Sequence, residues 1–172
     1  MNLLLEDQET ERLKFRKLTT NDFETWLPFH QNPLSTVHWF GENPDPNIAC
    51  QDWFNRVFHR YENGTGGLNA LISKKTGDFI GQCGLLVQEV DGKKELEIGY
   101  SMLPKYWRQG FATEAAQKCK EFAFDNNLSE SLISIIHIKN IPSQKVAFAI
   151  GMQLDKTTEY KGNPTYIFRV RQ

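Results

Sequence analysis

The residues from Arg108 to Thr113 combine hydrogen-bond donors with a glycine at the start of a stretch rich in helix formers. The first four N–H groups of a helix have no partner inside it, and the helix dipole places about half a positive charge there. Gly110 lets the backbone approach a ligand closely, and no Ser, Asp or Asn directly precedes it as a cap. Arg108 and Gln109 can donate to phosphate oxygens, and Ala112 keeps a second point of approach small. The segment has the chemistry of a phosphate-binding helix N-terminus.

A turn that uses its glycine only for backbone geometry is the alternative interpretation of this segment. The spacing from Gly110 to Ala112 is compatible with both interpretations. The chain has neither the P-loop pattern nor the Gly-x-Gly-x-x-Gly pattern of dinucleotide-binding proteins. A phosphate-bearing ligand at this turn would therefore belong to another class.

Hydrophobic periodicity and turn residues predict the elements that position this turn. Helices are expected around Phe23, Trp26 and Leu27 after a cap at Thr20 or Asn21, and from residue 48 to Gly64. A helix after the turn buries Phe111, Ala115, Ala116, Cys119, Phe122 and Ala123, and another follows Pro142 and ends at Gly151. Strands are expected at residues 11–19, 67–74, 79–89, 94–103, 131–140, 152–160 and 164–171. Residues 32–47 are rich in Pro and Asn and predict a loop.

The strand at residues 131–140 is apolar on both faces, which is typical of a central and often parallel strand. With the strand at 94–103 and the helix between them it forms a βαβ unit, whose crossover is right-handed. The expected fold class is α+β, with a mixed, mostly antiparallel sheet, helices on its faces and a central βαβ unit. Residues 1–172 form a single domain, and the charges of the last strand indicate a guarded sheet edge.

Composition excludes several classes of protein. The net charge of −1 over 172 residues leaves no basic footprint for nucleic acid. The cysteines Cys50, Cys83 and Cys119 fit neither a disulfide framework nor a zinc pattern, and the four histidines have no metal-ligand spacing. His137 is expected to be a core histidine. The short N-terminal apolar run is neither a signal peptide nor a membrane span, so a soluble cytoplasmic domain without a metal is expected.

Residues 96–115 closely resemble the central motif of the GNAT superfamily of acyl-CoA-dependent N-acetyltransferases, and above all the branch of ribosomal-protein N-terminal acetyltransferases. Residues 140–152 resemble that branch's Asn-x-x-Ser helix. Residues 10–26 and 77–85 resemble its first strand and helix and its third strand, so the resemblance covers nearly the whole chain. Trp107 stands where the wider family usually has Gln or Arg, as in many members of this branch.

The resemblance implies a fold in which the strands ending near Leu103 and Lys139 splay apart to hold acetyl-CoA as co-substrate. Backbone groups of Met102 and Leu103 would pair with the pantetheine arm. The N–H groups that would hold the pyrophosphate belong to Arg108, Gln109, Gly110, Phe111, Ala112 and Thr113. Asn140 and Ser143 would line the wall beside the thioester, although helix capping before Pro142 is the alternative role. Met152 replaces the usual Phe after Gly151, which leaves the phosphate-binding backbone intact.

Glu97 is the candidate general base for attack of an amine on the thioester. It lies in the middle of a strand expected to be covered on both faces, and a carboxylate in a cleft has a raised pKa. The resemblance implies the same glutamate, whereas the alternative is an exposed carboxylate paired with lysine. Glu95, nearer the turn, is expected to be solvated. Tyr100 alternates with core residues and is expected to serve packing.

Protonation of the leaving thiolate has two candidates, both suggested by the resemblance. Tyr160 lies in the late part of the sheet, where a tyrosine often has this role in the superfamily. Ser143 matches a serine of this branch's motif. We expect the loop at Val37–Asn47 to shape the choice of acceptor in this fold.

The expected function is transfer of an acetyl group to a primary amine, either a protein N-terminus or a small molecule. A non-catalytic acyl-CoA-binding module of the same fold is the alternative, and a nucleic-acid-binding or partner domain is a weaker third hypothesis. No nucleic acid or membrane partner is expected, and the chain would act as a monomer or a homodimer.

Overall fold

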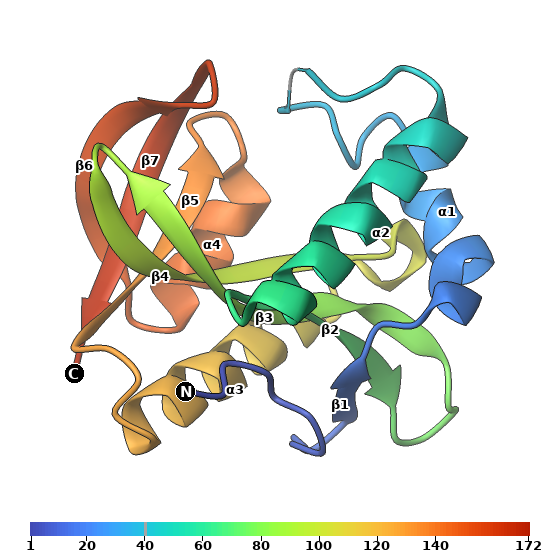
Figure 1. The fold of residues 1–172 in the computed structure, drawn as a ribbon, viewed down its shortest axis with the longest axis horizontal. Coiled ribbons are helices and arrows are strands. Elements are labelled where there is room, and N and C mark those ends of the chain that lie inside the picture. Colours follow the sequence, from blue (N-terminus) through green and yellow to red (C-terminus); the bar gives the residue numbers. More distant parts are fainter. Residues whose placement is uncertain (40) are drawn as a thin grey trace.

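Seven strands form one sheet in the order β1-β2-β3-β4-β5-β7-β6 in the computed structural model, which describes residues 1–39 and 41–172 (Figure 1). The strands are β1 (Leu13–Lys17), β2 (Gly66–Ser73), β3 (Phe79–Val90), β4 (Lys93–Met102), β5 (Ser131–His137), β6 (Gln153–Tyr160) and β7 (Asn163–Arg171). The α-helices are α1 (Phe23–Gln31), α2 (Pro46–Asn63), α3 (Phe111–Asp125) and α4 (Ile141–Ala149). Short 3₁₀ turns precede α1 at Thr20–Asp22 and follow β4 at Pro104–Tyr106.

The strands β4 and β5 are the parallel pair of the sheet, and one register pair, Glu97 with Ile133, joins them. The other strand pairs are antiparallel. Beyond the Glu97–Ile133 pair, the Ser134 hydroxyl donates to the Ile98 carbonyl oxygen at 2.9 Å. Figure 1 shows β4 and β5 running in different directions past this point, so the expected α+β fold with a βαβ unit and splayed strands is confirmed.

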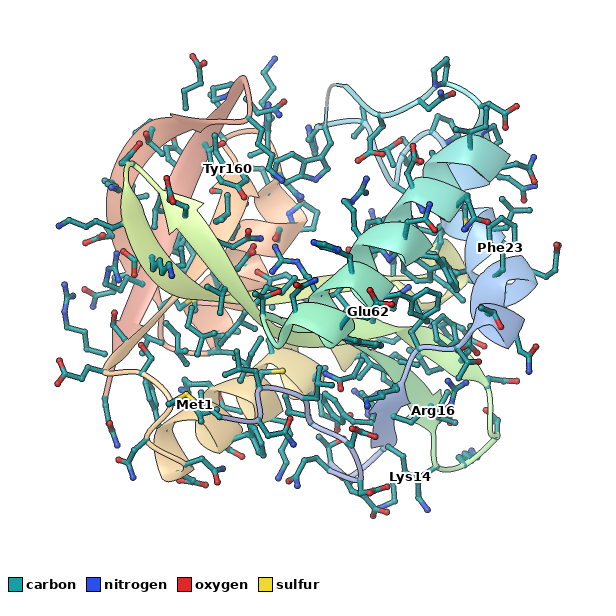
Figure 2. All side chains as sticks on the ribbon, in the orientation of Figure 1. Met1, Lys14, Arg16, Phe23, Glu62 and Tyr160 are labelled. Carbon is teal, nitrogen blue, oxygen red and sulfur yellow. The ribbon has the colours of Figure 1, made fainter. Side chains whose placement is uncertain are left out.

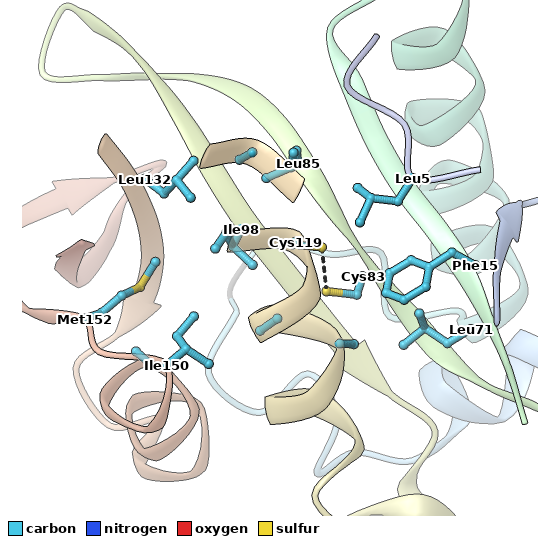
Figure 3. Close-up of a cluster of buried hydrophobic side chains, with 14 of the residues drawn as sticks. Leu5, Phe15, Leu71, Cys83, Leu85, Ile98, Cys119, Leu132, Ile150 and Met152 are labelled. Carbon is cyan, nitrogen blue, oxygen red and sulfur yellow. Dashed lines mark hydrogen bonds between the residues drawn. The ribbon is translucent and has the colours of Figure 1, made fainter. Parts of the chain in front are cut away.

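Helix α3 packs against one face of the sheet through small residues. Ala115, Ala116, Cys119 and Ala123 are fully buried, which lets the helix backbone lie close to β3 and β4. Figure 3 shows Cys119 against Cys83 of β3, with their sulfur atoms 3.5 Å apart. The periodicity of α3 predicted this buried face correctly, with Phe111 and Phe122 at its partly buried rim.

Helices α1 and α2 cover the other face of β2 and β3 with an aromatic core. Trp26 stacks on Phe29 and contacts Trp53, and Phe54 is buried beside them. The β6–β7 hairpin continues the sheet beside β5, and there Tyr160 packs with Ile133, Ile135 and Ile167.

Two expectations, one for the last strand and one for the start of α2, are corrected by the structure. Strand β7 is not a guarded edge, because it lies between β5 and β6, and both Ile167 and Phe168 are buried there. The edge is β6, in which most side chains are exposed. Helix α2 begins at Pro46 rather than at residue 48, because the Asp45 carboxylate caps the N–H groups of Asn47 and Ile48. In the described part of the chain, no helix is long and apolar enough to cross a membrane.

Candidate active site

The turn before α3 presents unprotected backbone to solvent. Gly110 is the N-cap of this 15-residue helix, with φ of 80°, and no side chain caps the helix start. Arg108 also has a positive φ, of 61°, and the residues from Arg108 to Gly110 are exposed. Since a helix start without a side-chain cap keeps N–H donors for an outside acceptor, the turn can receive an anion.

Arg12 contacts this turn from outside the βαβ unit. Its guanidinium donates to the Gln109 carbonyl oxygen at 2.9 Å and pairs with the Glu114 carboxylate at 3.3 Å. The same group lies 4.1 Å from the centroid of the Phe111 ring. Sequence reasoning missed Arg12, because a separation of 97 positions from Gln109 leaves no local signal for the contact.

The end of β4 has hydrogen-bond partners that sequence reasoning did not predict. The Trp107 indole N–H donates to the Met102 carbonyl oxygen at 2.9 Å. The Leu103 N–H donates to the Ile80 carbonyl oxygen at 3.0 Å. Trp107 thereby ties the 3₁₀ turn to the last residue of β4, and the Met102 carbonyl and the Leu103 N–H, which were expected to pair with pantetheine, already have partners in the protein.

Glu97 lies at the point where β4 and β5 separate. Gln88 of β3 donates from its side-chain amide to the Glu97 carboxylate at 2.7 Å. Burial raises the pKa of Glu97, and the Gln88 hydrogen bond and the Arg60 charge oppose this effect. Its carboxylate is thus held by an amide rather than by the lysine of the alternative interpretation.

Glu95, two residues earlier, corrects the expectation of a solvated side chain. Arg169 of β7 binds both carboxylate oxygens, at 2.7 and 2.9 Å, and side-chain exposure is only 15% for Glu95 and 10% for Arg169. The Arg169 hydrogen bonds lower the pKa of Glu95. Glu95 is therefore a structural partner of Arg169 in β7, whereas Glu97 is held by the Gln88 amide.

Tyr160 reaches the same amide as Glu97 from the end of β6. Its hydroxyl donates to the Gln88 side-chain oxygen at 3.2 Å, and Figure 2 shows Tyr160 at the inner side of the β6–β7 hairpin. Burial raises the pKa of Tyr160, and the nearby Glu97 carboxylate raises it further. Two of the three residues expected to be catalytic therefore share one neighbour.

Ser143 lies apart from Tyr160, against the α3-covered core. The Tyr100 hydroxyl donates to the Ser143 carbonyl oxygen at 2.8 Å, and the Ser143 hydroxyl lies 3.2 Å from the Tyr100 oxygen. Burial raises the pKa of Tyr100. Asn140 accepts from the Ser143 N–H at 3.2 Å and so caps α4, the alternative role that the sequence left open. Tyr100 does more than pack, since its hydroxyl joins β4 to α4.

The loop between α1 and α2 contacts the end of β5. The His38 ring stacks on His137 with centroids 5.2 Å apart, and the Trp39 ring meets His137 edge-on at 6.3 Å. His137 is 3% exposed, and its ring accepts from the Lys139 N–H at 3.1 Å, as expected of a core histidine. Phe40 of the expected acceptor loop lies outside the described residues. The described part of this loop thus borders the strand end beside the splay.

A family model described as an acetyltransferase (GNAT) domain matches residues 12–153, which include Glu97 and the Arg108–Thr113 turn. The chain belongs to the GNAT acetyltransferase family. It is an acyl-CoA-dependent N-acetyltransferase, and the reaction of this GNAT family transfers an acetyl group from acetyl-CoA. No cluster of three or more His, Cys, Asp or Glu residues suited to a metal ion occurs among residues 1–39 and 41–172.

Relatives and solved structures share this GNAT architecture along the chain. The Bacillus subtilis (strain 168) protein YkkB is 29% identical over 160 residues, which is 92% of each protein. The acetyltransferase from Agrobacterium tumefaciens str. C58 has a TM-score of 0.81 at 25% identity, covering 100% of this chain and 98% of that one. Mycobacterium smegmatis RimJ in complex with CoA-disulfide has a TM-score of 0.74 at 15% identity, covering 92% of this chain and 81% of that one, which shows likeness of fold alone.

Proposed function

We propose that this GNAT enzyme acetylates a primary amine by direct attack of the amine on the acetyl thioester, with Glu97 as the base. The observation that carries the proposal is the position of Glu97 at the register pair with Ile133, where β4 and β5 begin to diverge. In this geometry a thioester between the splayed strands would meet an amine arriving from the Glu97 side.

The residues of the α3 turn fit the diphosphate of acetyl-CoA. Gly110 is exposed and has a left-handed backbone, and a side chain at this position would first meet Arg12, at 3.4 Å. The uncapped N–H groups from Arg108 to Thr113 supply donors, and the cation of Arg12 adds positive charge behind them. Bound acetyl-CoA supplies an activated acetyl group. The pantetheine arm would lie along the end of β4 at Met102 and Leu103, with Asn140 and Ser143 along its wall.

The base has to take a proton from the incoming ammonium group. An α-amine has a pKa of about 7.7–8.0 and a lysine amine about 10.4, so the α-amine asks less of the base. Burial raises the pKa of Glu97 and makes its carboxylate a better proton acceptor. Both a protein N-terminus and a small primary amine meet this requirement.

The leaving thiolate needs a proton from the α4 side of the sheet. We assign this step to Ser143 together with Tyr100, because their hydroxyls lie 3.2 Å apart next to the splayed strands. Tyr160 is the other candidate, but its hydroxyl shares the Gln88 amide with Glu97, on the side from which the amine would arrive. Removal of the Ser143 hydroxyl should slow the chemical step, whereas Tyr160→Phe should act on the amine instead.

The test is a turnover screen with acetyl-CoA that measures thiol release. Peptides with free N-termini, the same peptides N-acetylated, polyamines and aminoglycosides serve as acceptors. The expected result is turnover with at least one free amine and a loss of about 100-fold or more in Glu97→Gln. Unchanged turnover in Glu97→Gln would remove Glu97 as the base, and absence of acetyl-CoA binding at millimolar concentration in calorimetry would defeat the whole proposal.

A further inference from the structure

The side-chain amide of Gln88 joins three elements that lie far apart in the chain. Its nitrogen donates to Glu97 of β4 at 2.7 Å. Its oxygen accepts from Arg60 of α2 at 2.9 Å and from Tyr160 of β6 at 3.2 Å. The conformations of the Glu97 and Tyr160 side chains therefore depend on one residue of β3, which carried no signal in the sequence.

Arg60 decides which way this amide faces. A guanidinium has only donors, so the Gln88 oxygen must face Arg60 and the Gln88 nitrogen must face Glu97. Arg60 is itself fixed, because it donates to the carbonyl oxygens of Val87 at 2.9 Å and Thr65 at 3.3 Å. The amide thus cannot rotate by half a turn without placing its NH₂ group against the guanidinium.

The orientation of Gln88 also fixes the role of the Tyr160 hydroxyl. Since the Gln88 oxygen only accepts, the Tyr160 hydroxyl must donate its hydrogen to it, and the lone pairs of the phenol oxygen remain as acceptors. Glu97 already receives one hydrogen bond from Gln88 and keeps further acceptor capacity. A carboxylate and a phenol oxygen are thereby held on either side of one amide, and both can accept.

Two acceptors held by one amide suit a group with several N–H donors and a positive charge. We propose that Gln88 is a positioning residue that holds Glu97 and Tyr160 as a pair of hydrogen-bond acceptors for the protonated primary amine of the acceptor substrate. This inference rests on the proposed function, and it explains how Glu97, the base of that proposal, is oriented. It also assigns Tyr160 to amine binding rather than to the thiolate.

The charges around Glu97 come from several packed elements. Arg60 of α2 and Lys161 of the β6–β7 turn lower the pKa of Glu97, as does the backbone of Ile135 in β5. When Gln88 alone is changed, Arg60 should keep its bonds to the Val87 and Thr65 carbonyl oxygens, so the effect of the amide on Glu97 can be measured separately.

The first experiment is a carbon-13 NMR titration of the Glu97 carboxyl group without any substrate, with the resonance assigned by its loss in Glu97→Gln. Gln88→Leu should raise the pKa of Glu97 by about one unit, because one hydrogen bond to the charged form is lost. Gln88→Glu should raise it further through like charge. The matched control is Gln117→Leu, which removes an amide–carboxylate bond of 2.8 Å to Glu121 on exposed α3 and should leave Glu97 unchanged.

The second experiment measures steady-state kinetics with the best acceptor of the amine screen. Tyr160→Phe should raise KM for the amine about 3- to 10-fold with a smaller change in kcat. It should leave unchanged the acid limb of the pH profile of kcat/KM, which is the fall in rate at low pH. Gln88→Leu should raise the same KM and also move the acid limb of kcat/KM upward. If Gln88→Leu titrates like wild type, or Tyr160→Phe leaves KM unchanged, the inference is overturned. Absence of amine turnover in the wild-type protein would instead overturn the proposed function. Because the NMR titration uses no substrate, it tests the role of Gln88 separately from that outcome.

Discussion

The Ser134 hydroxyl donates to the Ile98 carbonyl oxygen at 2.9 Å, one residue beyond the pair that joins β4 to β5. A side chain of β5 here satisfies a backbone acceptor of β4 where the strands separate, and both residues are buried. The splay can therefore open without leaving this buried carbonyl group unpaired.

Ser134→Ala should destabilise the fold by about 1–3 kcal/mol, because the Ile98 carbonyl oxygen would lose its buried partner. Urea unfolding measures the change in the free energy of unfolding. Ser129→Ala is the control, since its hydroxyl bonds the Ser131 carbonyl at 2.7 Å in a partly exposed turn where water can replace it. Equal losses in both variants would contradict a special role for Ser134 at the splay.

Gly110→Asp should weaken acetyl-CoA binding by about 100-fold or more, because like charges at close range cost several kcal/mol. Calorimetry with acetyl-CoA measures the effect. Gly77→Asp is a matched control, since φ is 76° at Gly77 and 80° at Gly110 and a side chain at Gly77 meets no atom within 4 Å. Both variants carry similar backbone strain, so equal affinities would show that the diphosphate does not bind at the α3 turn.

The acid limb of kcat/KM should lie above pH 4.5, the ordinary pKa of a glutamate, because burial raises the pKa of Glu97. The base is active when it is deprotonated, so the rate falls as pH drops through this raised pKa. Glu97→Gln should remove the limb together with most of the turnover. An acid limb that persists in this variant would assign the titration to another group.

The same pKa shift has a consequence for stability. The folded protein binds a proton at Glu97 more readily than the unfolded chain does, so this residue lowers the free energy of unfolding as pH rises from 4.5 through the folded pKa. Glu97→Gln should therefore raise the melting temperature more at pH 8 than at pH 4. The opposite order would contradict the direction of the shift.

Arg169→Met should destabilise the fold by about 3–5 kcal/mol at pH 7, because it leaves the Glu95 carboxylate without its bidentate partner. The double variant Glu95→Gln with Arg169→Met should recover part of this loss. Since Arg169 lowers the pKa of Glu95, the contribution of the pair is present above the unfolded pKa and disappears as pH falls through the folded pKa. A difference that is constant down to pH 2 would mean that the charge of Glu95 is not involved.

Elements marked by local chemistry could be predicted from the sequence. Asp91 and Gly92 form the turn between β3 and β4 with φ of 49° and 76°, and Gly64 ends α2 with φ of 63°. The glycine turn before α3 and the parallel strand after it were also predicted, because the turn lies within the six residues Arg108–Thr113 and β5 is apolar on both faces. Each of these features depends on residues that are neighbours in the chain.

Errors arose where a distant partner decides the environment of a residue. The charges of β7 indicated an edge strand. Instead, Arg169 forms an ion pair with Glu95, and β6 is the strand at that edge of the sheet. Tyr100 alternates with core residues, and the alternation does not reveal that its hydroxyl meets Ser143, 43 residues away. Alternating side chains predict which face of a strand is buried, but they do not identify the polar group that a side chain meets on that face.

The sequence by itself determined the α+β fold, the turn at Gly110 and the resemblance to GNAT enzymes, because periodicity and turn residues act through adjacent residues. Only the tertiary structure placed Arg12 behind that turn and joined Glu97, Gln88 and Tyr160. Hydrogen bonds between such distant residues depend on how the strands and helices pack, which local sequence patterns do not encode. The environment of the candidate base was thus decided by the packing of β3, β4, α2 and β6 around one amide.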